Sequence, residues 1–195
     1  MSSLAVPLSR LTLADRFVPR TLATDTILVL GGAAFTGLLA QAAVPLWPVP
    51  ITGQTLAVML VASSLGMVRG TLSLLVYAAL GVVGVPWFSG WEGGPSVLLG
   101  PTGGYIVGFL VAAVVTGWLA ERGGDRRLLR ALGTFGLATV SVFAIGLPWL
   151  AIALGTDLEQ TLQFGLYPFI VGGVVKAVLA ALIMPAAWWV QAKRK

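Results

Sequence analysis

The stretch F-I-V-G-G-V-V-K-A-V-L-A-A-L-I-M-P-A-A-W-W-V, at positions 169–190, decides the fold. A helix needs roughly 20 mostly apolar residues to cross the hydrocarbon core of a bilayer. This run is long enough, and Lys176 is its only ionisable side chain. The sequence therefore predicts a helix that spans a membrane.

Five further apolar stretches precede this one, and each is interpreted as a spanning helix. They cover residues 26–44, 52–68, 71–85, 103–120 and 131–154. The second and third are short for a bilayer, so tilted or broken helices are compatible with them. Hydrophobic residues make up 57% of the chain and charged residues only 10%, against about 25% charged residues in soluble domains. The predicted fold class is an all-α membrane protein, a bundle of six transmembrane helices.

The basic residues alternate with these spans. Of the 12 Lys and Arg residues, all except Lys176 lie before the first span, after the last, or in every second connection. Because positive charge is retained in the cytoplasm, both termini are predicted to be cytoplasmic. Residues 1–24 are then a cytoplasmic leader, and residues 25–195 form the transmembrane substrate-binding domain. A signal peptide cleaved near Ala40-Gln41-Ala42 is the alternative for the N-terminus.

Several function classes lack support in the composition. The chain has no Cys and no His, which removes disulfides, thiol nucleophiles and His-based zinc sites. It has no phosphate-binding glycine loop and no paired carboxylates within a span, so neither an enzyme nor a metal or other cofactor is expected. The net charge of +5 is scattered over short loops, which argues against nucleic acid as a partner. The expected surroundings are a lipid bilayer.

Lys176 is the main candidate for ligand chemistry. It lies about 10 Å of helix rise beyond Phe169. A charge at membrane depth is costly and usually functional. The alternative is that its ammonium group snorkels to the interface, but its depth disfavours this. We therefore expect Lys176 to bind a ligand or to couple transport.

The start of the fourth span is a second candidate. Gly103 and Gly104 follow Pro101 and Thr102, and they leave backbone N–H groups open at a helix N-terminus. Such an end can hold an anion, and transporters direct such ends at substrate carboxylates. The two glycines could equally pack against a neighbouring helix, and the sequence leaves both interpretations open.

Two outer loops complete the predicted site. The proline-rich, uncharged loop 44–54 suits a lid with Gln54 at its edge, or else a rigid connector. The loop 86–94 combines aromatic rings with glycines and with Glu92, its only charge. Its rings could enclose an apolar ligand or could anchor the chain at the membrane interface.

Small residues line one face of the first span. Ala33 and Gly37 lie four positions apart, a spacing that allows helices to approach closely. They could form a docking face for a partner membrane protein, or they could pack inside the bundle.

Several motifs together resemble the BioY family, the biotin-specific substrate-binding (S) component of energy-coupling-factor (ECF) transporters. The stretches that carry the resemblance are V-P-I-T-G-Q-T at 49–55, G-V-V-G-V-P-W-F-S-G at 81–90, E-G-G at 92–94, L-G-P-T-G-G-Y at 99–105 and Y-P-F-I-V-G-G-V-V-K at 167–176. The resemblance implies a six-helix bundle in a prokaryotic plasma membrane with a biotin pocket near its outer face. It also implies docking on a membrane-embedded T component with two ATPase subunits, with Ala33 and Gly37 at that contact.

From the residues and the resemblance together, ten substrate-binding residues are predicted: Gln54, Tyr77, Trp87, Glu92, Gly93, Gly94, Gly103, Gly104, Tyr105 and Lys176. The chain departs from the family at one point. The family motif has an acid three residues before its lysine, where this chain has Gly173. We hypothesise that Glu92 supplies the missing carboxylate, to Lys176 or to the ligand.

The sequence leaves three alternatives open. They are an S component for thiamine or riboflavin, a small carrier or channel that uses Lys176 and acts alone, and a lysine-dependent membrane enzyme.

Overall fold

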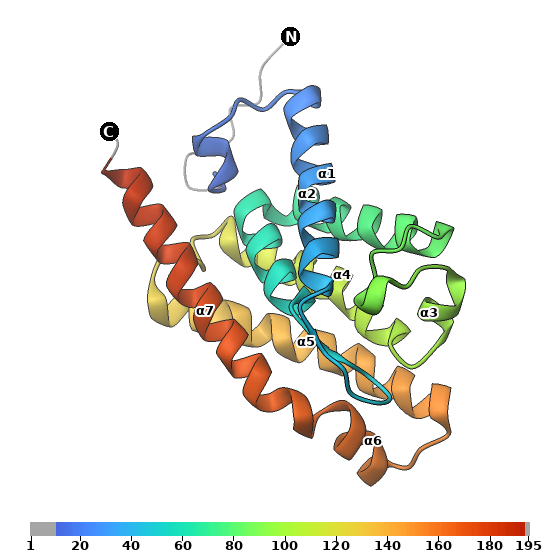
Figure 1. Ribbon diagram of the computed structural model, residues 1–195. Helices are drawn as coiled ribbons and strands as arrows, with labels where there is room; N and C mark the ends of the chain where they lie inside the picture. The colour runs from blue at the N-terminus through green and yellow to red at the C-terminus, as the bar shows by residue number, and fades with distance from the viewer. Residues whose placement is uncertain (1–10, 194–195) are drawn as a thin grey trace.

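The computed structural model describes residues 11–193, and its long elements are α-helices (Figure 1). The helices are α1 (Leu22–Ala40), α2 (Gln54–Val83), α3 (Pro95–Leu99), α4 (Gly103–Ala120), α5 (Leu128–Leu154), α6 (Leu158–Gly165) and α7 (Tyr167–Ala192). The structure also has two short antiparallel strands, β1 (Ala43–Val44) and β2 (Ile51–Thr52). Two 3-10 turns are present as well, η2 (Ala14–Arg16) and η3 (Ser89–Trp91). In the described part, five helices are long and apolar enough to cross a membrane. The predicted all-α membrane class is confirmed.

Helix α2 covers the two spans predicted at residues 52–68 and 71–85. Its two legs are separated at Gly66, whose φ of 86° and ψ of −178° are not helical, so the break lies just before the predicted connection at residues 69–70. Glycine adopts a positive φ at little steric cost, so one residue makes a turn for which we had expected a short connection. The two legs lie against each other, because Gln54 near the start of the first reaches Tyr77 in the second.

The other long helices lie close to their predicted positions. Helix α4 has the predicted bounds, whereas α5 begins about one turn earlier than predicted, at Leu128. Helix α1 begins at Leu22 instead of residue 26, because Thr21 and Thr24 form a capping box at its start. It ends at Ala40, and Ala43 and Val44 enter strand β1 instead of continuing the span.

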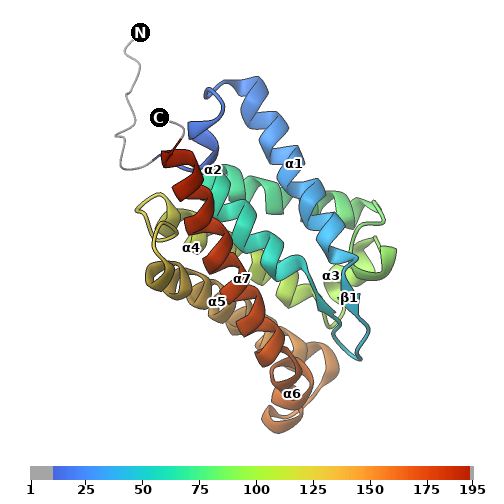
Figure 2. The same ribbon diagram turned by 60° about the vertical axis from the view of Figure 1, so that its left-hand side comes forward.

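The connection between α4 and α5 lies at the end of the molecule where α1 begins and α7 ends (Figure 2). Asp125 in this connection is fully buried, and its carboxylate accepts hydrogen bonds from Ser63 Oγ (2.9 Å) and Trp188 Nε1 (2.8 Å). Burial raises the pKa of Asp125, against the effect of these two hydrogen bonds. Arg126 donates to the carbonyl oxygen of Leu11 (3.1 Å). We call this end the inner end and the opposite end the outer end.

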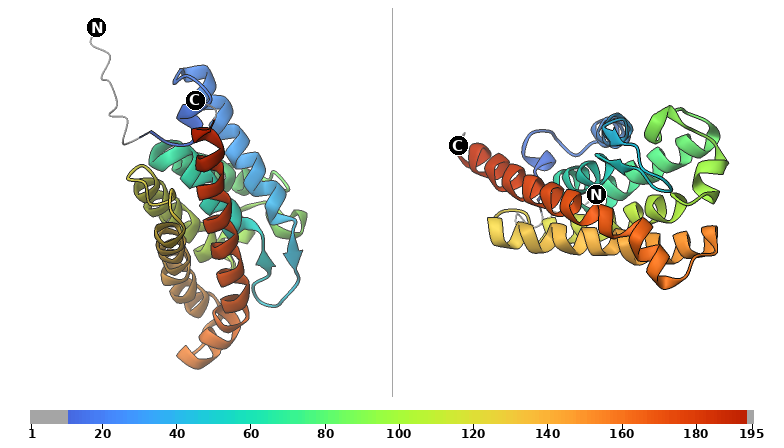
Figure 3. Two further views of the ribbon diagram at one scale, coloured as in Figure 1. Left: turned by 90° about the vertical axis from the view of Figure 1, so that its left-hand side faces the viewer. Right: turned by 60° about the horizontal axis from the view of Figure 1, so that its bottom comes forward.

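Helix α4 occupies the centre of the bundle, between α2 and α5. Its contact faces are built from glycine: a Cβ at Gly108 would lie 2.8 Å from the carbonyl oxygen of Val142, and one at Gly117 would overlap the backbone of Met67. Small residues let apolar helices approach closely in lipid. On the other side, α7 runs between α5 and the hairpin of β1 and β2 (Figure 3). Residues of α4, α5, α7 and the hairpin line a cavity at the outer end.

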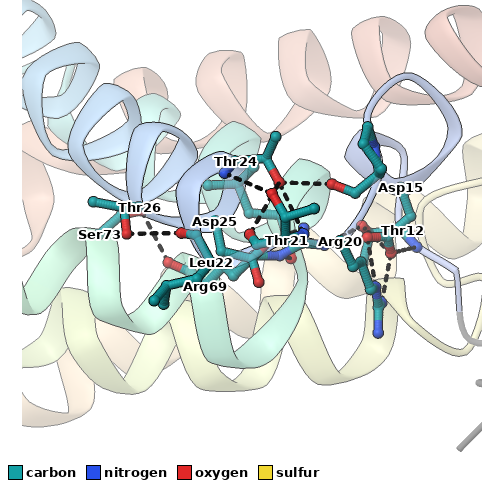
Figure 4. A network of polar contacts seen from close by, with 12 residues as sticks. Thr12, Asp15, Arg20, Thr21, Leu22, Thr24, Asp25, Thr26, Arg69 and Ser73 are labelled. Carbon is teal, nitrogen blue, oxygen red and sulfur yellow. Dashed lines mark hydrogen bonds and ion pairs between the residues drawn. The ribbon is translucent and has the colours of Figure 1, made fainter. Parts of the chain in front are cut away.

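The N-terminal segment is bound to α2 by charged groups (Figure 4). Arg69, predicted in a connection, lies inside α2 and is 8% exposed. It forms ion pairs with Asp15 (2.5 Å) and Asp25 (3.1 Å), and Arg20 pairs with Asp15 (2.6 Å). Burial would raise the pKa of Asp15, but hydrogen bonds from Arg20, Thr12 and Arg69 outweigh it and hold that pKa well below its usual range. These contacts fix the described part of the leader to the inner end.

The prediction of orientation rests on the basic residues, and three of these lie outside the described residues: Arg10, Arg194 and Lys195. The cytoplasmic location of the inner end and the division of the chain at residue 24 stay predictions.

Candidate functional site

A cavity of about 750 Å³ opens at the outer end of the bundle. Small-molecule sites usually measure about 300–1,000 Å³. Its walls come from the β1–β2 hairpin and the start of α2, from the segment 88–102, and from α4, α5 and α7. Four of the ten predicted substrate-binding residues line it: Gln54, Glu92, Tyr105 and Lys176.

Lys176 reaches this cavity from α7. Its Nζ donates a hydrogen bond to the backbone carbonyl oxygen of Thr52 (2.8 Å), at the end of strand β2. No ion pair to Lys176 is found among residues 11–193. The ammonium group is therefore held inside the bundle by a peptide carbonyl, and this arrangement disfavours the snorkelling alternative.

Gln54 is fixed at the cavity wall by a short polar chain. Its Oε1 accepts a hydrogen bond from Thr52 Oγ1 (2.7 Å), and its Nε2 donates to the Tyr77 hydroxyl (2.5 Å). Behind Tyr77, Trp87 Nε1 donates to the Tyr77 carbonyl oxygen (2.9 Å). Tyr77 and Trp87 do not line the cavity; they hold Gln54 in place.

Aromatic rings form one wall. Tyr105 stacks on Phe169 with ring centroids 6.2 Å apart, and Phe143 meets both rings edge to face. The Tyr105 hydroxyl donates to the carbonyl oxygen of Gly165 (2.9 Å), at the end of α6. The wall offers an apolar surface to a ligand ring while the buried hydroxyl is satisfied elsewhere.

Gly103 and Gly104 pack against their neighbours instead of lining the cavity. A Cβ at Gly104 would overlap the side chain of Trp149 on α5, and the N–H of Gly103 donates to the carbonyl oxygen of Gly100 (3.1 Å). This geometry favours the packing alternative. A role for these N–H groups in anion binding stays a prediction.

The glycines of the loop 86–94 shape the turn around Glu92. Gly94 has a φ of 99° and donates its N–H to the Gly81 carbonyl oxygen (2.7 Å). A Cβ at Gly93 would lie 2.8 Å from the Val85 carbonyl oxygen. Glu92 is exposed at the cavity wall, and the hypothesis that its carboxylate serves Lys176 or the ligand stays a prediction.

Ala33 and Gly37 face the inside of the bundle. Ala33 is 1% exposed, and a Cβ at Gly37 would lie 3.1 Å from the Trp87 side chain. Their positions favour the packing alternative, and a docking role stays a prediction.

Several cavity-lining residues were missed in the sequence, among them Phe143 and Phe169 of the aromatic wall and the polar residues Gln41 and Thr139. Gln41 lies just beyond the end of α1, where its only sequence signal was an amide following a long apolar run. Thr139 lies on α5, and its Cγ2 would be 3.6 Å from a Cβ at Gly173, the position that lacks the family acid. Among the described residues, no group of three Asp or Glu side chains converges as metal ligands would.

These features define a class of protein. A bundle of apolar helices surrounds a ligand-sized cavity, with a lysine, an amide and an aromatic wall converging on it at one end. This is the architecture of a membrane-embedded binding protein for a small organic molecule.

The chain belongs to the BioY family, whose sequence profile matches residues 9–193. It is 40% identical to the biotin transporter BioY of Thermotoga maritima, over 76% of this chain and 88% of that protein. It is 38% identical to the probable biotin transporter BioY of Pyrococcus horikoshii, over 83% and 94%. A crystal structure of the S-component for biotin from an ECF-type ABC transporter superposes with a TM-score of 0.76 and 26% identity, over 84% of this chain and 90% of that one.

Proposed function

We propose that this protein captures biotin at the outer face of a prokaryotic plasma membrane, as the S component of an ECF-type ABC transporter. The observation that carries the proposal is the outer cavity, where Lys176 meets Thr52 beside an aromatic wall. Relatives named as biotin transporters support biotin as the substrate.

The cavity matches the chemistry of biotin. Biotin has an apolar fused ring, a ureido group with two donors and one acceptor, and a carboxylate tail. Tyr105 and Phe169 offer faces for the ring. Gln54 is an amide at the wall, and Lys176 has three N–H donors, of which the Thr52 carbonyl uses one. Because a buried polar group left unpaired costs about 1–3 kcal/mol, such a site rejects molecules that lack the ureido group.

Transport requires partners. This chain has no phosphate-binding glycine loop, so ATP hydrolysis belongs to two ATPase subunits, which act through a membrane-embedded T component. The protein itself is a multi-pass membrane protein that binds its substrate without changing it chemically.

The test is saturable binding of labelled biotin to the purified protein, with unlabelled biotin, thiamine and riboflavin as competitors. We expect only biotin to compete. If thiamine or riboflavin displaced the labelled biotin, that vitamin would be assigned as the substrate instead. An absence of saturable binding would refute the proposal. Uptake into liposomes that contain this chain alone would instead support an autonomous carrier.

A further inference from the structure

Gln41 makes more connections at the cavity mouth than any predicted site residue. Its Nε2 donates to the carbonyl oxygens of Gly37 (3.2 Å), Trp87 (3.2 Å) and Phe88 (3.0 Å). Its Oε1 accepts the backbone N–H of Trp91 (3.1 Å). One amide side chain at the end of α1 thus bridges its own helix, at Gly37, to the segment 87–91.

This segment has an anchored side and an exposed side. The Phe88 side chain is 1% exposed and fills the space over Gly81, and Trp87 is bonded to Tyr77 of α2. Residues 89–92 line the cavity mouth beside Phe88. The N–H of Phe88 donates to the carbonyl oxygen of Glu92 (3.0 Å) and closes the turn on itself. Among the described residues, the hydrogen bond from the Trp91 N–H to Gln41 is the one that joins residues 89–92 to a part of the chain outside residues 88–92.

The backbone at this point needs support. Gly90 and Trp91 both have left-handed φ values, of 74° and 61°. A non-glycine residue rarely adopts such a φ unless its surroundings hold it there. The Trp91 side chain is 68% exposed and provides little packing. Besides the hydrogen bond between Phe88 and Glu92, the amide of Gln41 supplies the contact that ties this turn to α1 over the cavity.

We propose that Gln41 is a positioning residue that fixes residues 89–92, including Glu92, at the mouth of the ligand cavity. Its effect on biotin retention rests on the function proposed above, whereas its effect on the position of the mouth does not. Loss of its hydrogen bonds lets the mouth segment open while its anchor on α2 remains. A bound ligand then escapes faster, and the rest of the bundle stays folded.

Two substitutions distinguish the donor role of the amide from its acceptor role. Gln41→Ala removes all of its side-chain hydrogen bonds. Gln41→Glu keeps an acceptor for Trp91 but sets a carboxylate oxygen against the carbonyl oxygens of Trp87 and Phe88, with no proton to share. Lowering the pH protonates that carboxylate and restores one donor. An effect that recedes in acid is specific to this contact, because general loosening of the fold would not recover in this way.

The chain has no cysteine, so a single thiol can report on the mouth. Ser89→Cys places the thiol at a half-buried position on the cavity wall. In this background and without ligand, we expect Gln41→Ala and Gln41→Glu to raise the rate of maleimide labelling at least about fivefold, the effect of losing one ordinary hydrogen bond. At acid pH, the labelling rate of the Gln41→Glu variant should approach that of the parent measured at the same pH. Gln163→Ala, on the exposed face of α6, is the matched control and should label at the parent rate.

Biotin dissociation is then measured on the same variants, with a similar increase expected. Equal labelling rates in parent and variants would overturn the inference. Faster labelling in a protein that does not bind biotin would refute the proposed function but leave the role of Gln41 intact. If neither variant folds, hydrogen exchange on the unmodified protein decides. The Trp91 amide should exchange at least about tenfold more slowly than an unstructured peptide, and exchange at the peptide rate would overturn the inference.

Discussion

Replacing Lys176 with methionine should separate ligand binding from stability. A lysine at the centre of a membrane helix costs about 2.5–3.5 kcal/mol on insertion scales. A hydrogen bond from a charged donor, such as the one to Thr52, returns about 1.5–3 kcal/mol. The free protein should therefore gain about 0–2 kcal/mol in the Met variant, seen as an unchanged melting midpoint or a rise of up to roughly 4–8 °C for a chain of this size.

The affinity for biotin should fall in the same variant. If Lys176 donates a charged hydrogen bond to biotin, its loss costs about 1.5–3 kcal/mol, or roughly a 10- to 150-fold increase in Kd. Calorimetry gives the affinity, and a thermal scan of the ligand-free protein gives the midpoint. Lys193→Met is the matched control, because it removes an ammonium group from the inner end of the same helix. An affinity within twofold of the parent would remove Lys176 from the site, and a large fall in the midpoint would show that it serves the fold instead.

Three further predictions concern other parts of the molecule. Glu92→Gln should weaken biotin binding by roughly tenfold; equal affinity would refute the idea that its carboxylate serves Lys176 or the ligand. Gly104→Leu should lower the melting midpoint, since overpacking costs about 1–3 kcal/mol or more, whereas Gly133→Leu, with open space around it, should not; matching midpoints would contradict the close packing of α4 on α5. Because the pKa of Asp15 is depressed in the folded protein, its stabilisation is complete above the ordinary value of 3.8 and is lost as the pH falls below it. The midpoint should therefore fall between pH 6 and pH 3 more steeply than in Asp15→Asn, and parallel curves would exclude this contribution.

Much of the fold could be predicted from apolar run length. Helix α4 has its predicted bounds, because glycine and proline precede it and charged residues follow it. The break at Gly66 could not be predicted in the same way. A connection was expected at residues 69–70, but the turn is made at Gly66, where a Cβ would lie 2.7 Å from side-chain atoms of Thr12 and Glu121. The local sequence does not report such contacts. The short helix α6 was also missed, since it lies in a connection that apolar run length does not describe.

The site could be predicted in part, for a similar reason. Lys176 and Gln54 stand out because polar groups are rare near the membrane and need a partner. Gly103 and Gly104 were also singled out, but their role could not be predicted, because a glycine beside a ligand and one beside a helix have the same sequence signature. Gln41 was missed because its partners lie on a distant loop, and no local pattern reports such a contact.

The glycine break in α2 has a consequence for the depth of the binding site. The first leg, residues 54–65, rises only about 18 Å, while the hydrocarbon layer is about 30 Å thick. A leg of this length that begins at one headgroup layer ends well short of the other. With Gly66 at the inner surface, the strands β1 and β2, which precede the leg in the chain, would lie within the hydrocarbon layer, where non-helical backbone is tolerated only if protein or water shields it from lipid. A vitamin that enters from outside would therefore bind below the membrane surface, in the space beyond the end of the shortened helix.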